Sequence, residues 1–269
     1  MSPPRTVFHV RDAGLWPHDA DFMVAAFDST IPHLAAAGNV GQWGDQPFSD
    51  KDGFVHDTHE DVRLSEAYRL TGVGQPVRTF IAEVRIGQDD NNNGANSSYN
   101  NDDDGVAAAV DGGGSEHGNG EKRRDDHRQA ALPTRTTPSG ARYLPVGLMT
   151  IRDGAFSRHV SANLQLRPHT QRARDEHSGG FIYIDVVVTD FRAGRHRVGA
   201  GAALLRAATA YARDRGRRAV YLDCWTGGTR KLVPYYESFG FQSVQDFAAK
   251  RKDGSVWPGK LMRLDLHGE

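Results

Sequence analysis

Residues 181–225 read FIYIDVVVTDFRAGRHRVGAGAALLRAATAYARDRGRRAVYLDCW. The apolar run Phe181–Val188 predicts a buried strand, and the end of the segment, Ala219–Trp225, predicts a second one. Between them a basic loop leads into two closely spaced glycines and a helical pattern over about Val198–Arg215. The order strand, turn, helix, strand is typical of domains in which helices cover a sheet.

Further strands and helices are predicted on both sides of this segment. The predicted strands and helices are a strand at Thr6–Arg11, helices at about Asp19–Ala37 and from Asp57 or Thr58 to Leu70, a short helix at Lys231–Ser238, and a hairpin of Phe241–Ala249 with Lys260–Leu266. Residues 157–180 are expected to form a polar connection. Strands outnumber helices early in the chain and alternate with them late, which predicts an α/β fold of the α+β type, a mixed sheet with helices on its faces.

The interval 87–140 differs sharply in composition from the rest. Of its 54 residues, 9 are Gly, 8 Asp and 7 Asn, so it cannot bury enough apolar surface to offset the entropy of ordering. It separates two strand-like runs, Arg78–Ile86 and Tyr143–Ile151, that would pair as a hairpin if the insert is a long loop. We expect a single domain over residues 1–269 with a disordered insert at 87–140; a junction between two domains is the alternative.

Charge and composition exclude several classes of protein. The 33 Lys+Arg against 34 Asp+Glu give a formal net charge of -1, which argues against a nucleic-acid binder. No apolar run is long enough to span a bilayer and the first residues lack the apolar core of a secretory signal, so we expect no membrane association and a cytoplasmic location. Cys224 is the single cysteine and the histidines lack paired ligand spacing, so no metal site is expected.

Gly199 and Gly201 open the predicted helix, and Arg192, Arg195 and Arg197 precede them. Because the glycines lack Cβ atoms, an anion could approach the first N–H groups of the helix, where the helix dipole and the arginines favour negative charge. A tight turn followed by close helix packing explains the same glycines equally well.

Two other phosphate-binding motifs fit less well. A Walker loop requires Lys and Ser or Thr after its glycines, whereas Ala202 and Ala203 follow Gly201, so that motif is excluded. A dinucleotide-binding fingerprint has an acidic residue about twenty residues after its glycines, and Asp223 stands at about this distance. Its third glycine position, however, holds Leu204, which makes it a distant alternative.

From Phe181 to Phe241 the chain resembles the GNAT N-acetyltransferase superfamily. The pyrophosphate loop of that family, Arg/Gln-x-x-Gly-x-Gly/Ala, is matched by His196, Gly199 and Gly201, and its Tyr-Glu-x-x-Gly-Phe block is matched by Tyr235–Phe241. His196 departs from the first position and is largely neutral near pH 7, so one of the neighbouring arginines is expected to supply the charge.

The resemblance implies a GNAT-like central mixed sheet flanked by helices, with acetyl-CoA as cosubstrate. Thr229 stands where the family often has Asn. The residues to which the resemblance assigns cofactor binding are Val187, Val188, Arg195, His196, Arg197, Val198, Gly199, Ala200, Gly201 and Thr229.

Acetyl transfer to an amine requires a proton donor for the thiolate, a base for the amine and a donor to the oxyanion. The resemblance assigns the proton donor to Tyr236 and the oxyanion contact to a backbone N–H near Val187 or Val188. Asp185, a carboxylate within an apolar strand, is the leading candidate base. A structural ion pair with an arginine is an equal alternative for Asp185, and Asp223 and Glu237 are weaker candidates for the base.

These features together predict an N-acetyltransferase that transfers acetyl directly to the primary amine of a small molecule. A protein acetyltransferase and a noncatalytic acyl-CoA-binding module are the alternatives, and the sequence leaves room for a homodimer. Trp43, Phe48 and Phe54 are expected either to line an acceptor pocket or to fill the core. Cys224 is expected to be a small buried residue rather than a nucleophile.

Overall fold

The computed structural model describes residues 6–87, 132–176, 180–251 and 253–266. Most of the predicted insert at 87–140 therefore lies outside the described residues. Its last nine residues, 132–140, are described, and they contain a short strand, β3 (Arg135–Thr136), that pairs with β4 (Arg142–Asp153). The low-complexity composition thus overestimates the length of the insert at its C-terminal end.

The strands form one sheet in the order β1-β2-β4-β5-β6-β8-β7, and β3 pairs with β4 outside that order. Its remaining members are β1 (Phe8–Asp12), β2 (Val77–Ile86), β5 (Phe181–Thr189), β6 (Ala219–Trp225), β7 (Gln242–Lys250) and β8 (Val256–Asp265). Only β5 and β6 pair in parallel, and all other described neighbours are antiparallel. The predicted mixed sheet is confirmed, and so is the pairing of the two strands that flank the insert.

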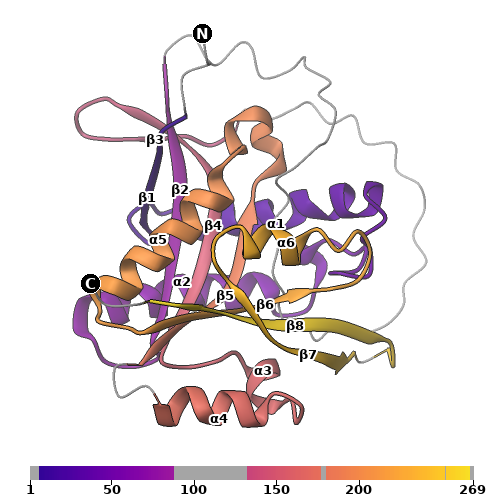
Figure 1. Cartoon of the computed structure of the whole chain (residues 1–269). Coiled ribbons are helices and arrows are strands. Elements are labelled where there is room, and N and C mark those ends of the chain that lie inside the picture. Colours follow the sequence, from indigo (N-terminus) through magenta and orange to yellow (C-terminus); the bar gives the residue numbers. More distant parts are fainter. Residues whose placement is uncertain (1–5, 88–131, 177–179, 252, 267–269) are drawn as a thin grey trace, which may run out of the picture.

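Helices cover both faces of the sheet (Figure 1). They are α1 (Asp19–Ala36), α2 (Phe54–Thr71), α3 (Arg158–Ala162), α4 (Arg167–Glu176), α5 (Ala200–Asp214) and α6 (Leu232–Glu237), with 3-10 turns η1 (Phe48–Asp50) and η3 (Phe191–Arg197). The side chains of α1 pack with Val186 and Val188 of β5, whereas those of α5 pack in the cluster that contains Val187. Because successive strand residues point to opposite faces, α1 and α5 lie on opposite faces of the sheet. None of the described helices is long and apolar enough to cross a bilayer.

The predicted elements agree with the structure except at three places. The helix expected from Asp57 or Thr58 begins at Phe54, because Gly53 has a φ of +75° and ends the preceding turn there. The last strand begins at Val256, four residues before the predicted Lys260. The supposed polar connection contains α3 and α4. The sequence shows no apolar stripe for α4, because its buried residues include Thr170 and Ala173, whose side chains are small or polar.

Gly147 of β4 lies where α5 approaches the sheet most closely. A Cβ at this position would lie 2.9 Å from the backbone O of Val188, 3.4 Å from Leu204 and 3.6 Å from Ala200. The first of these contacts is shorter than a Cβ tolerates, and a backbone atom cannot rotate away. Gly147 thus allows α5 to begin directly against the sheet.

We expect Gly147→Ala to lower the free energy of unfolding by about 1–3 kcal/mol, because the added methyl group must displace β5 or α5. Urea denaturation followed by circular dichroism measures the change. An unchanged midpoint would show that the helix can shift without loss.

Candidate active site

The strands β5 and β6 part in the middle of the sheet. Their parallel pairing runs from Phe181 opposite Ala219 to Ile184 opposite Leu222 and ends there, although both strands continue. Figure 1 shows β6 turning away from β5 beyond this point. Backbone groups on the two facing edges consequently have no ladder partner, and the sheet has a gap between them.

A β-bulge at Asp185 marks the beginning of the gap. The register between β4 and β5 passes from Thr150 opposite Val186 to Ile151 opposite Ile184, so Asp185 has no residue opposite it. A bulge places two successive residues on the same face, and Asp185 and Val186 therefore both face the side of the sheet that carries α1 and α2. The bulge turns the Asp185 carboxylate toward that face at the point where the strands diverge.

The backbone of β5 presents Val187, rather than Val188, to the gap. The N–H of Asp190, just after the strand, donates to the O of Val146 on β4 at 2.9 Å. Since N–H groups of an antiparallel strand alternate in direction, Val188 N–H also points toward β4 and Val187 N–H points away from it. Of the two residues expected to supply an oxyanion contact, Val187 directs its N–H toward the gap, whereas Val188 directs its N–H toward β4.

The N-terminus of α5 follows β5 through η3. Gly199 precedes the helix with a φ of +90°, no side chain caps it, and the N–H of Ala203 bonds to Gly199 O at 3.0 Å. The N–H groups of Ala200, Gly201 and Ala202 therefore have no acceptor within the helix. A Cβ on Gly199 would lie 3.2 Å from the ring of Phe8, so both the backbone conformation and this contact require glycine.

The basic residues before Gly199 differ in their surroundings. The guanidinium of Arg197 lies 3.9 Å from the ring centroid of Phe191, and His33 of α1 stacks on the same ring at 3.9 Å. Burial and the charge of Arg197 lower the pKa of His33. Arg195 is exposed, and so is the side chain of Val198. Arg195 is thus the more available of the two arginines for an anion at the start of α5.

Tyr236 lies on the face of the sheet that carries α5. Its side chain is fully buried, and its hydroxyl has no hydrogen-bond partner among the described residues. Burial, and next the neighbouring Cys224, hold the pKa of Tyr236 well above its usual value, so the phenol stays protonated. A buried hydroxyl without a partner is costly, so this donor is available to an acceptor that reaches it.

On the opposite face four polar side chains form a closed ring just before the gap. The hydroxyl of Tyr183 donates to Asp223, whose second oxygen lies 3.2 Å from Nε2 of His159. Nδ1 of His159 lies 3.0 Å from Oγ of Ser157, which in turn lies 3.2 Å from the Tyr183 hydroxyl. The ring joins β5, β6 and α3 where the last pairs of the two strands are made. Because Asp223 is fully buried and bonded on both oxygens, it is a structural group and a poor candidate for the base.

Asp185 forms the second polar group on this face. Its Oδ2 accepts a hydrogen bond of 2.7 Å from Nε of Arg152, and 16% of its side chain is exposed. Burial raises the pKa of Asp185, while Arg152 opposes the shift. Asp61 of α2 interacts with the charges of both Asp185 and Arg152. Burial raises the pKa of Asp61 to about 6; the charge of Arg152 opposes this shift and the charge of Asp185 adds to it. The predicted ion pair of Asp185 with an arginine is thus present, and the second oxygen of the carboxylate has no hydrogen-bond partner among the described residues.

Several other predicted site residues lie elsewhere. Thr229 bonds to Asn39, its N–H to Oδ1 at 3.2 Å, so it fastens the loop after β6 to the end of α1. Trp43 and Phe48 are buried with Phe27 in the core under α1, so the core interpretation of these aromatic residues is the correct one. Cys224 is buried as expected, and burial raises its pKa strongly.

Besides Tyr183 and Ser157, three residues of these polar groups were missed from the sequence. Arg152 is the penultimate residue of β4, His159 lies in the supposed polar connection, and Asp61 lies within a helix. Only Asp61 carried a usable signal, as a carboxylate on a helix expected to face the sheet. The other two are brought to the cluster by long-range packing.

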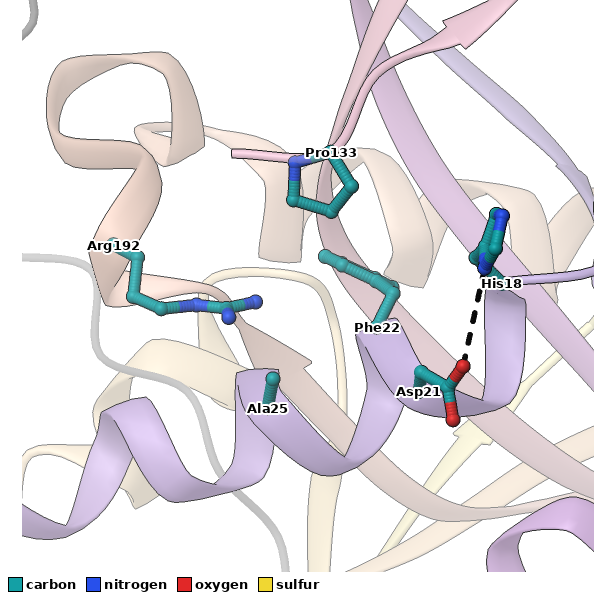
Figure 2. A pocket seen from close by; sticks show the side chains of 6 residues that line it. All are labelled: His18, Asp21, Phe22, Ala25, Pro133 and Arg192. Carbon is teal, nitrogen blue, oxygen red and sulfur yellow. Dashed lines mark ion pairs between the residues drawn. The ribbon is translucent and has the colours of Figure 1, made fainter. Parts of the chain in front are cut away.

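Two hollows occur among the described residues. One, of about 350 Å³, lies between α1 and η3 and is lined by His18, Asp21, Phe22, Ala25, Pro133 and Arg192 (Figure 2). The other, of about 390 Å³, is lined by Thr226, Arg230, Val233, Asp246 and Lys260.

In a comparison with known protein families, residues 152–241 match the model of the acetyltransferase (GNAT) family. The matched residues include β5, η3, α5, β6 and α6, and the match confirms the resemblance seen in the sequence. No curated protein matches the chain in sequence.

Similar solved structures include the Salmonella typhimurium protein yncA with its cofactor acetyl-CoA, at a TM-score of 0.48 and 13% identity over 97% of this chain and 95% of that one. They also include a ribosomal-protein-alanine N-acetyltransferase from Brucella melitensis, at a TM-score of 0.47 and 12% identity over 96% and 99% of the two chains.

We expect Asp61→Asn to raise the free energy of unfolding by about 1–3 kcal/mol at pH 7. The pKa of Asp61 is about 6 in the folded protein and 3.8 as a free side chain, so the folded state holds the proton more tightly. Wild-type stability is therefore lost as pH rises from about 4 to above 6, and the variant does not suffer this loss. Urea titrations between pH 3.5 and 8 measure the difference, which should vanish below pH 4.

The control is Glu60→Gln, on the exposed side of the same helix. Arg63 holds the pKa of Glu60 below its usual value, so removal of this charge should give no gain at pH 7. A gain from Asp61→Asn that is equal at pH 3.5 and pH 7 would show that packing, rather than charge, is responsible.

Proposed function

Since residues 152–241 match the acetyltransferase (GNAT) family, we propose that this chain transfers an acetyl group from acetyl-CoA directly to the primary amine of a small molecule. The observation that carries the proposal is the parting of β5 and β6 after Ile184 and Leu222. It leaves a gap with candidate acid and base groups on its two sides. The acid side carries Tyr236 and α5, and the base side carries Asp185.

The residues present fit an acyl-CoA. The free N–H groups of Ala200, Gly201 and Ala202 suit the diphosphate, because the positive end of the helix dipole adds to their hydrogen bonds. The exposed Arg195 adds charge at the same end, where the family pattern has Arg or Gln one residue later. The orphaned hydroxyl of Tyr236 suits the sulfur, since this buried donor otherwise has no acceptor among the described residues.

When bound, acetyl-CoA supplies a thioester whose carbonyl carbon accepts the amine. The N–H of Val187 points into the gap, where it would donate to the carbonyl oxygen as negative charge develops. Tyr236 would donate its proton to the departing thiolate. A phenol suits this role because burial keeps it protonated at neutral pH, so its O–H can donate to the thiolate.

The acceptor must lose a proton before it attacks. An alkylamine with a pKa of about 10.4 is neutral in about one molecule per few thousand at pH 7, which corresponds to about 4–5 kcal/mol. Asp185 would accept this proton with Oδ1, while Arg152 holds Oδ2 and fixes the orientation of the carboxylate. Burial raises the pKa of Asp185 and makes it a stronger base than an exposed carboxylate.

The surroundings of Asp185 support a small amine as acceptor. Only 16% of the Asp185 side chain is exposed, and the neighbouring Tyr183 and Asp223 are fully buried. A primary ammonium group on a narrow chain could reach such a carboxylate, and Asp61 adds a second negative charge that favours a cation. A folded protein surface would need a wider approach.

An assay of thiol release from acetyl-CoA tests the proposal directly. The panel contains small primary amines and lysine-bearing peptides, and cofactor binding is measured separately by calorimetry. Thiol release with small amines supports the proposal, whereas release with peptides alone would assign a protein acceptor. Tight binding of the cofactor without release from any amine would identify a noncatalytic acyl-CoA-binding module.

Tyr236→Phe should lower kcat by about 100-fold and leave the dissociation constant of acetyl-CoA within about twofold, because only the proton transfer is lost. The same variant should unfold at the same or a higher urea concentration, since an unpaired buried hydroxyl is removed. The adjacent Tyr235→Phe is the matched control and should keep its kcat. Unchanged turnover in Tyr236→Phe would remove this residue from the mechanism.

Ala202→Asp should weaken acetyl-CoA binding by more than about tenfold without destabilising the fold. An Asp in the first helical turn is favourable for the helix itself but repels a diphosphate bound there. Ala202→Asn, of the same size but neutral, is the control and should bind within about threefold of wild type. Equal affinities of the two variants, measured by calorimetry, would contradict a diphosphate site at this helix.

A further inference from the structure

The ring of Ser157, His159, Tyr183 and Asp223 contains four hydrogen bonds, and each of them needs one proton. The Tyr183 hydroxyl donates to Oδ1 of Asp223, and Oγ of Ser157 donates to the Tyr183 oxygen at 3.2 Å. Each hydroxyl has a single proton, so these two bonds use both of them. The two bonds that remain are those of His159.

The contact between Ser157 and His159 places a proton on Nδ1. Oγ of Ser157 lies 3.0 Å from Nδ1, and it also accepts from the N–H of Val160 at 3.4 Å as the N-cap of α3. Because the proton of this hydroxyl is directed at Tyr183, Oγ can only accept from Nδ1. A neutral histidine has one N–H, so its Nε2 would then carry a lone pair.

The contact between His159 and Asp223 needs a further proton. Nε2 lies 3.2 Å from Oδ2, and lone pairs on both atoms would repel each other. The imidazole is the stronger base, with an ordinary pKa of about 6.5 against about 3.9 for the carboxyl group. All four bonds are therefore made when His159 is an imidazolium ion and Asp223 is a carboxylate.

Burial makes each of these bonds matter. Asp223 and Tyr183 are fully buried, and 15% of the His159 side chain is exposed. A buried carboxylate is costly unless a cation and hydrogen-bond donors compensate its charge. His159 supplies the ion pair of Asp223, and the Tyr183 hydroxyl supplies the second donor.

Other charged groups on this face are balanced among themselves. Asp185 of β5 pairs with Arg152 of β4, and Asp61 of α2 interacts with the charges of both. Asp185 also interacts with the charges of His159 and Asp223, which act on it in opposite directions. A positive His159 is thus compensated by Asp223 within the ring.

We propose that His159 is a positioning residue that stays doubly protonated at neutral pH and fastens β6 to α3 where the pairing of β5 with β6 ends. Its two N–H groups reach Asp223, which follows the last paired residue of β6, and Ser157, which caps α3. When one proton is lost, two lone pairs face each other and the ring opens. As a device of the acetyl-transfer site it rests on the proposed function, but its protonation can be measured without any substrate.

Proton–nitrogen NMR of the histidine side chains of the full chain at pH 7.5 tests the protonation. We expect both ring nitrogens of His159 to show the shifts of protonated nitrogen, whereas a free histidine is about nine-tenths neutral at this pH. The exposed His56 is the internal reference, and His159→Gln assigns the signal. One protonated and one unprotonated nitrogen at His159 would overturn the proposal.

Ser157→Ala provides a second measurement. Without Oγ the Nδ1–H has no acceptor in the ring, while a neutral His159 with its hydrogen on Nε2 still donates to Asp223. The titration midpoint of His159 should fall by about one pH unit, which is a tenfold loss of proton affinity. Ser161→Ala, at an exposed position of the same helix, is the control and should leave the midpoint unchanged. Equal midpoints in wild type and Ser157→Ala would contradict the proton count.

Turnover of a small amine tests the positioning role. His159→Gln should lower kcat by about tenfold at pH 6.5 and leave the dissociation constant of acetyl-CoA within about twofold. The ratio of wild-type kcat to variant kcat cancels the ionisation of the amine, and it should fall as pH rises through the His159 midpoint. A ratio that is constant with pH would assign His159 to packing alone and overturn the positioning role. If no amine is acetylated, the proposed function fails, whereas the NMR result still decides the protonation of His159.

Discussion

The arrangement of the whole molecule depends on the end of the pairing between β5 and β6. Two parallel strands in the middle of a sheet normally exchange hydrogen bonds along their length, and here the exchange stops after four residue pairs. The separation is stabilised just before it begins by the ring of Tyr183, Asp223, His159 and Ser157. These side chains fasten the strands to each other and to α3, so the gap has a fixed origin.

Because successive strand residues point to opposite faces, the polar side chains near the gap lie on two different faces of the sheet. Adjacent residues of β6, Asp223 and Cys224, point to opposite faces, one toward His159 and the other toward Tyr236. The bulge at Asp185 adds the acidic group to the first of these faces. Tyr236 and Asp185 therefore lie on opposite faces of the sheet.

Arginines hold the surrounding elements together through buried ion pairs. Arg11 of β1 binds both Asp19, at the start of α1, and Glu83 of β2, and Arg135 of β3 binds the same Glu83. Such pairs are satisfied on both sides, which is the condition for burying charge without a large penalty. They fix the N-terminal strand and the described end of the insert against the sheet.

Local patterns in the sequence were sufficient for the strands other than β3 and the start of β8, for α1, α5 and α6, and for the turn at Gly199, because each depends on neighbours within a few residues. The catalytic roles that the sequence suggests for Tyr236 and Asp185 stay predictions. Local patterns could not show that Val187 rather than Val188 faces the gap, because a bulge and a register are properties of paired strands. Nor could they bring Arg152, His159 and Asp61 together, since these residues belong to different elements and meet only when the sheet and helices pack. Those long-range contacts determine the charge and burial of the side chains at the gap and the directions in which they point. The repeating apolar pattern of each segment, in contrast, is a property of the sequence alone.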